Sequence, residues 1–139
     1  ASVLERQGFR VLADLAKLNI PYQNTALLAQ RRYLNSAPEM VERLLRAMSD
    51  SVAFVLEPKN KERVLRSIAK GLRLTRAEDA LGGYERLGNM YQRRIFPNVD
   101  GIRSTIRFLG ATNDKIRALK AEELVDERFV KKLELEGRF

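Results

Sequence analysis

Four consecutive polar side chains, Tyr22-Gln23-Asn24-Thr25, are the residues of this chain best suited to hold a small ligand. A phenol, two amides and a hydroxyl can donate and accept hydrogen bonds. Small-molecule sites use a few such groups to orient what they bind. The same residues could instead form a polar turn that satisfies its own backbone. Both interpretations stay open, and Tyr22, Gln23, Asn24 and Thr25 are the predicted ligand-binding residues.

Residues that could perform catalysis are missing or scattered. The 139 residues include no cysteine and no histidine, which excludes disulfides, zinc or haem held by Cys or His, and Cys–His nucleophile pairs. Ser49 and Ser51 lack a histidine base, and there is no GxSxG elbow. The carboxylates fit helix caps and solvated faces, and no pair stands out as an acid–base couple. We therefore predict no catalytic residue, no metal site, no cofactor and no enzymatic activity.

The charge of the chain favours an anionic partner. Its net charge is +8, from 26 basic and 18 acidic residues, which suits nucleic acid, anionic lipid or a small anion. Arg31-Arg32-Tyr33 and Tyr91-Gln92-Arg93-Arg94 interleave arginines with aromatics, as nucleic-acid-binding surfaces do. However, cations are spread along the whole chain among acids, and no recognition-helix signature, RNA-binding motif or GxxxxGK loop occurs. Nucleic acid is therefore not the expected partner.

The predicted secondary structure changes from strands to helices near residue 34. Residues 9–15, FRVLADL, and 25–30, TALLAQ, predict two short strands, and Pro21 marks a turn between them. Apolar residues at helical spacing then predict helices over residues 36–56, 60–70, 77–95, 99–109, 121–124 and 126–137. Residues 111–117 are expected to be a polar loop.

Punctuating residues support these boundaries. Ser36 and Thr75 each begin a capping-box sequence, and Pro58 ends the first long helix. Gly71, Gly110 and Gly137 are predicted at the C-terminal ends of their helices. Three more glycines fall inside the predicted 77–95 helix, and we interpret them as positions of close helix packing: Gly82, Gly83 and Gly88.

These elements predict a mainly α fold with a short two-stranded β element. We expect one domain over residues 1–139, with a strand-containing segment at 1–34 and a helical region at 35–139. A two-stranded ribbon is marginal by itself, so the helix beginning near Ser36 is expected to cover it. Because exposed strand edges also invite pairing with another copy, a homodimer through the strand region is predicted.

The order of five segments resembles the C-terminal third of one family, the ABC-transporter solute-binding proteins of the nitrate, sulfonate, taurine and thiamine-pyrimidine-precursor type. The segments are GFRVLADL, IPYQNT, NSAPEMVERLLRAMSDSVAF, IFPNVDGIRSTIRFLGATN and ELVDERFVKKLELEGRF. Together they cover nearly the whole chain, and their order and spacing carry the resemblance more than any single motif.

The resemblance implies a fragment of an α/β two-lobed fold, the type II periplasmic-binding-protein fold, with ligand held between the lobes. Residues 22–25 would then lie at a crossing between lobes, and residues 25–30 would join the first lobe's sheet. It further implies a periplasmic or otherwise extracytoplasmic receptor that delivers a small solute to an ABC permease and is membrane-associated through that transporter. The alternative from the residues themselves is a basic helical module that binds nucleic acid or a protein.

Overall fold

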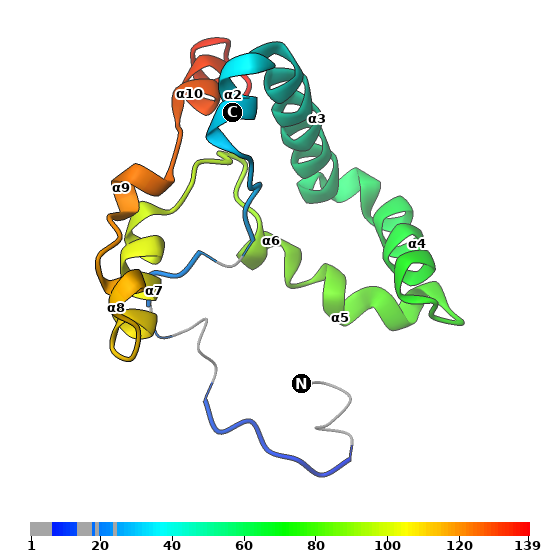
Figure 1. The fold of residues 1–139 in the computed structure, drawn as a ribbon. Coiled ribbons are helices and arrows are strands. Elements are labelled where there is room, and N and C mark those ends of the chain that lie inside the picture. The colour runs from blue at the N-terminus through cyan, green and yellow to red at the C-terminus, as the bar shows by residue number, and fades with distance from the viewer. Residues whose placement is uncertain (1–6, 14–17, 19, 24) are drawn as a thin grey trace. The chain divides into compact units, whose positions relative to one another are not determined.

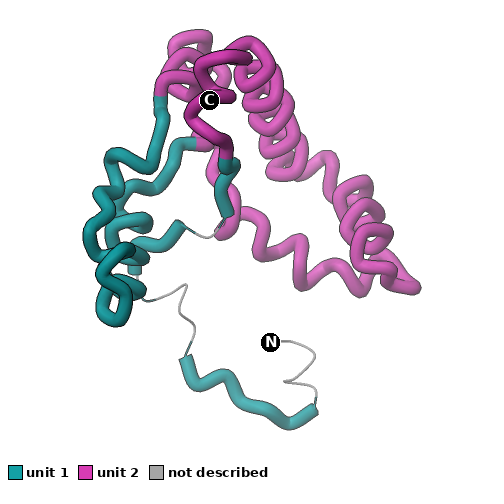
Figure 2. Tube along the Cα trace, in the orientation of Figure 1, with its two compact units in different colours: residues 1–28, 96–127 teal, residues 29–95, 128–139 magenta. Residues whose placement is uncertain are grey.

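A computed structural model describes residues 7–13, 18, 20–23 and 25–139 of the chain. The protein is mainly helical, as predicted (Figure 1). Its contacts divide it into two compact units (Figure 2). Unit 1 comprises residues 1–28 and 96–127, and unit 2 comprises residues 29–95 and 128–139. This division does not decide whether the chain is a single domain, which stays a prediction.

Unit 2 contains most of the helices. They are α2 (Arg31–Ser36), α3 (Pro38–Leu56), η2 (Pro58–Asn60), α4 (Lys61–Leu72), η3 (Ala77–Ala80), α5 (Leu81–Tyr84), α6 (Leu87–Met90) and α10 (Arg128–Leu135). The apolar face of α10 packs against α3, and α4 packs against η3 and α5. Buried apolar side chains mark these two contacts: Val41, Phe129, Val130 and Leu133 in the first, Val64, Ala69 and Ala80 in the second.

Unit 1 is built around α7 (Val99–Gly110), which contacts α8 (Asp114–Arg117) and α9 (Ala121–Leu124). The side chain of Asn98 caps α7, because its oxygen accepts a hydrogen bond from the Gly101 N–H at 2.9 Å. Gly110 lets α7 approach α8, since a Cβ there would lie 2.9 Å from the Arg117 Cα. The buried residues of this unit are small, so its helices meet closely: Gly101, Gly110 and Ala121.

The predicted two-stranded element is not formed, and this prediction was wrong for the residues that the structure describes. Neither 9–13 nor 25–30 is a strand, while residues 14 and 15 of the first segment lie outside the described part. Leu12 is 92% exposed and Leu28 is 88% exposed, so neither segment has an apolar cover. The helix expected to cover them is α3, whose contacts within unit 2 are with α2, η2, α6 and α10. Without that cover, a ribbon of two strands has too little burial to persist.

Several helix ends are confirmed and others are corrected. Helices α7 and α9 match their predicted ranges, and α10 is followed by Gly137 at φ +71°. Neither capping box forms: Ala37 precedes α3, Arg76 precedes η3, and neither helix start has a side-chain cap. Gly71 lies inside α4, and Arg73 takes the left-handed C-terminal position at φ 54°. The expected 111–117 loop contains α8, whose cap is Asn113.

The predicted 77–95 helix is divided into η3, α5 and α6, with a gap at residues 85–86, and its three glycines lie inside α5 and α6. Close packing does not explain them, because a Cβ at Gly82 or Gly88 would meet nothing within 4 Å and one at Gly83 only the Ile68 side chain at 4.0 Å. Each glycine disfavours a continuous helix by up to about 1 kcal/mol relative to alanine. The glycines therefore weaken a continuous helix here, while the gap itself falls at residues 85–86.

Candidate functional site

The predicted ligand-binding stretch lies beside the start of α7 within unit 1. Tyr22 is 62% exposed, Thr25 is also exposed, and Gln23 is half-buried. Asn24 lies outside the described residues. The structure thus presents the phenol of Tyr22 to solvent and turns the Gln23 side chain toward its own protein.

Gln23 uses both ends of its amide inside the chain. Its Oε1 accepts a hydrogen bond from the Asn98 N–H at 2.6 Å, and its Nε2 donates to the Thr25 carbonyl oxygen at 2.6 Å. The first bond joins residues 75 positions apart, and the second closes a local turn. Gln23 therefore holds the stretch on α7, as a turn-forming residue does.

The close approach at this point requires a glycine in α7. A Cβ at Gly101 would lie 2.6 Å from the Gln23 nitrogen and 2.6 Å from the Tyr22 carbonyl carbon, both main-chain atoms. Only a residue without a side chain lets the backbone of residues 22–23 rest on the first turn of α7. Gln23, Asn98 and Gly101 together form one attachment, which we call the α7 clamp.

The clamp leaves two described side chains of the predicted stretch to face a ligand. Tyr22 offers an aromatic ring with a donor-acceptor hydroxyl, and Thr25 offers a second hydroxyl. Neither lines the cavity that α7, α8 and α9 form in this unit, which is described below. The stretch is therefore an anchored, one-sided surface rather than an enclosed pocket.

A cavity of about 360 Å³ lies elsewhere in unit 1, between α7, α8 and α9. Its lining combines aliphatic side chains with cations: Arg103, Ile106, Arg107, Gly110, Ala111, Arg117, Leu119, Lys120, Ala121 and Glu122. Sequence reasoning did not single out this cavity. The available signal was the four-residue spacing of Arg103 and Arg107, but it becomes a site only through the α7–α9 contact.

Most cations around this cavity already have carboxylate partners. Arg103 bonds Asp100 and Glu122, and Arg117 bonds Asp114. A backbone hydrogen bond at Glu122 and the Arg103 guanidinium lower the pKa of the Glu122 carboxyl, which keeps the pair charged. Within the described chain, Arg107 makes no ion pair and is the cation here available to a small anion.

A second cavity of about 290 Å³ lies in unit 2, between α2, α3 and α10. Its charged groups bond one another: Lys132 Nζ lies 2.7 Å from both oxygens of Glu42, and Arg128 Nη2 donates to the Asn35 side-chain oxygen at 3.3 Å. These contacts leave its polar lining largely satisfied. The cavity in unit 1 is the better candidate for a bound anion.

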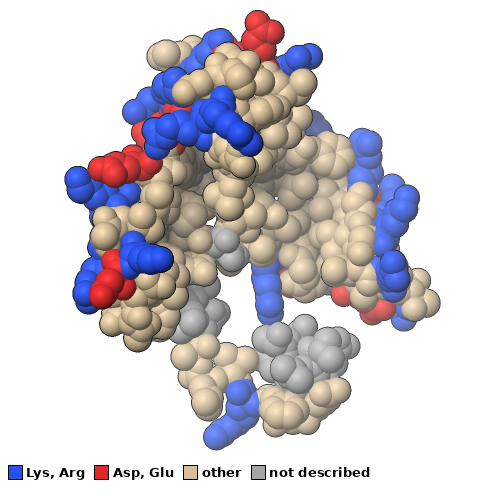
Figure 3. All heavy atoms as spheres, in the orientation of Figure 1, with Lys and Arg blue, Asp and Glu red and all other residues tan. Residues whose placement is uncertain are grey.

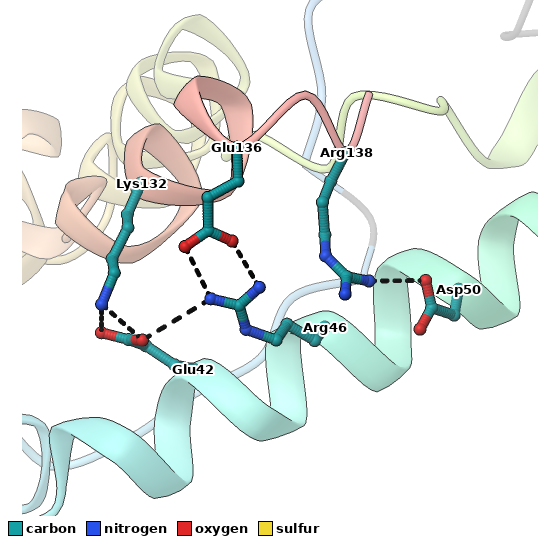
Figure 4. Close-up of polar contacts among 6 residues, drawn as sticks. All are labelled: Glu42, Arg46, Asp50, Lys132, Glu136 and Arg138. Carbon is teal, nitrogen blue, oxygen red and sulfur yellow. Dashed lines mark hydrogen bonds and ion pairs between the residues drawn. The ribbon is translucent and has the colours of Figure 1, made fainter.

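The charged surface is mixed over most of the visible face, with basic atoms gathered beside α4 (Figure 3). In unit 2 many charged side chains form ion pairs within the protein. A ladder of these pairs joins α3 to α10 and to the residues that follow α10 (Figure 4). Arg46 binds Glu136 through both guanidinium nitrogens, one at 2.7 Å, and Arg138 donates to Asp50 at 2.8 Å. Each partner on α3 is one turn from the next, so the ladder follows one helix face.

The described part of the chain holds no group of three or more His, Cys, Asp or Glu side chains arranged to bind a metal ion. No helix among those residues is long and apolar enough to cross a membrane. The chain matches no protein-family model, no curated protein and no solved structure. Any functional statement therefore rests on its own residues.

Proposed function

We propose that the chain is the C-terminal part of a two-lobed extracytoplasmic solute-binding receptor, which delivers a small solute to the permease of an ABC importer. The positive net charge favours an anionic solute. In this proposal the protein is not an enzyme and uses no cofactor. It would work outside the cytoplasm and associate with the membrane through the transporter.

One observation carries the proposal: residues 20–28 are anchored on one side and uncovered on the other. The α7 clamp fixes Gln23, while Ile20, Tyr22 and Leu28 are 57%, 62% and 88% exposed. A run of exposed apolar and aromatic side chains on an anchored segment is typical of a surface that another part of a protein covers. The crossing segment of a two-lobed receptor would be covered in this way.

Each residue of the predicted site then has a distinct part. Tyr22, Asn24 and Thr25 would face the solute, with the Tyr22 ring covering its apolar side and the hydroxyls orienting its polar groups. Gln23 would position them, because its amide is already bonded to Asn98 and Thr25. Affinity would come from closure of the lobes around the solute.

The two extended segments fit the same proposal. Residues 9–13 and 25–30 would become strands when the sheets of the two lobes supply neighbours, since strand pairing needs a partner for each edge. In their absence a second copy could supply that edge, which is the proposed homodimer through the strand region. The runner-up function, a basic helical module for nucleic acid or a protein, is favoured by the basic surface beside α4.

Thermal melting of the complete natural protein tests the proposal. Small anionic and neutral solutes are screened singly, and a cognate solute at a hundred times its Kd should stabilise the protein by about 2.7 kcal/mol. Duplex DNA serves as the comparison, with binding measured over a range of NaCl concentrations. A protein that no solute stabilises, but that binds DNA with a steep salt dependence, would support the runner-up instead.

A further inference from the structure

Three cations lie on one face of α4 with no acid among them. Arg63, Arg66 and Lys70 are spaced i, i+3 and i+7, so they project from the same side of the helix. All three are exposed. Lys59 precedes them in η2 and Arg73 follows at the end of α4, and both are exposed as well. We call Arg63, Arg66 and Lys70 the α4 stripe.

The opposite face of α4 is occupied by the protein itself. Val64 and Ala69 are 4% and 7% exposed, and the helix packs against η3 and α5. The apolar side of this amphipathic helix is therefore largely covered, except at its last residue, Leu72, which is 66% exposed. A partner that approaches the outer face of α4 therefore meets positively charged side chains.

The positive charge of the α4 stripe is little neutralised, and one of its side chains is restrained by a neighbouring ring. The only acid of α4 is Glu62. Its side chain is 88% exposed, and its carboxylate lies 4.0 Å from the Arg66 guanidinium. The Arg63 guanidinium lies 4.8 Å from the centre of the Phe54 ring, which restrains its direction through a cation–π contact. In Figure 3 the basic atoms gather along the outer side of α4.

We propose that the α4 stripe is a docking surface for an anionic lipid bilayer, held by charge without insertion. Clusters of Lys and Arg on an amphipathic helix bind anionic lipid surfaces, and a plane can meet all of these side chains at once. Nucleic acid suits the stripe less well, because the Phe54 ring beside Arg63 is half-buried and already engaged by that guanidinium, which leaves it poorly placed to stack on bases. This inference does not depend on the proposed solute.

The test is co-sedimentation of the full chain with vesicles of phosphatidylcholine, with and without phosphatidylglycerol. Binding is expected only to the vesicles that contain phosphatidylglycerol, and added NaCl should weaken it. Because each cation contributes about a fivefold gain in partitioning, the triple variant Arg63→Gln, Arg66→Gln, Lys70→Gln should bind roughly a hundredfold more weakly.

A matched control removes the same charge from other places. Arg43→Gln, Arg86→Gln and Lys115→Gln also remove three exposed cations, and this variant should retain binding within a few-fold of the original chain. Melting curves by circular dichroism establish that both variants fold. Equal losses in the two variants, binding that ignores salt, or binding to duplex DNA but not to the vesicles would each overturn the proposal.

Discussion

Replacing Gly101 with alanine should separate residues 20–28 from α7. The added Cβ would lie 2.6 Å from two main-chain atoms of residues 22 and 23, whereas ordinary contact begins at 3.4 Å. The two backbones must therefore move apart by about 0.8 Å, and no side-chain rotation can relieve the contact. The Gln23–Asn98 hydrogen bond of 2.6 Å would be lost or strained by the same movement.

The net cost follows from three contributions of different sign. Overpacking of this kind costs about 1–3 kcal/mol, and the lost hydrogen bond about 1 kcal/mol more. Alanine regains up to about 1 kcal/mol through its helix propensity. The Gly101→Ala chain should thus unfold with a free energy lower by about 1–3 kcal/mol.

Urea unfolding followed by circular dichroism measures this loss, and chymotrypsin reports the local effect by cleaving after Tyr22. Cleavage should be faster in the Gly101→Ala chain. Gly82→Ala is the matched control, because its Cβ would meet nothing within 4 Å; it should be neutral or more stable by up to about 1 kcal/mol. An unchanged unfolding free energy together with unchanged cleavage at Tyr22 would refute the close contact between the stretch and α7.

Three further predictions concern unit 2. Leu133→Ala should cost about 2–5 kcal/mol in urea unfolding, because this side chain is 0% exposed between α10 and α3, whereas Leu135→Ala, at a 91% exposed position, should change stability by less than about 0.5 kcal/mol. Ser49→Ala should be neutral or stabilise by up to about 1 kcal/mol, because the buried Ser49 hydroxyl has no hydrogen-bond partner among the described residues; a large loss of stability would reveal a missed partner. The Arg46 guanidinium lowers the pKa of the Glu136 carboxyl, so their pair stabilises the fold above the usual carboxylate range and is lost as pH falls through the lowered pKa. Melting temperatures measured against pH should therefore fall less steeply on acidification for Glu136→Gln than for the original chain, and parallel curves would contradict this.

Helices with a strong apolar period and a clear stop signal could be predicted from the sequence. Helix α3 ends at Leu56 before Pro58, and α7 and α9 have their predicted bounds, because spacing and breakers act locally. The 77–95 region shows the limit of that reasoning. Its apolar period predicted one helix, but the chain forms η3, α5 and α6 with a gap at residues 85–86; glycines at 82, 83 and 88 lower helix stability on both sides of that gap.

The capping boxes at Ser36 and Thr75 failed for a different reason. Such motifs specify a possible start, and Ser36 is instead the last residue of α2, a six-residue helix with no apolar period to predict it. The candidate site was only partly predictable as well. Tyr22 and Thr25 are available on a surface, but the bond from Asn98 to Gln23 joins residues 75 positions apart, and no local pattern contains it.

The central claim is that residues 25–30 form a strand only when the rest of a two-lobed receptor supplies its neighbours. Amide hydrogen exchange of these residues, measured in this chain and in the complete natural protein, tests that claim most directly. We expect the amides of residues 25–30 to exchange fast in the 15.9 kDa chain and to be strongly protected in a larger natural protein. Equally fast exchange in both, or a natural protein with the mass of this chain alone, would contradict it.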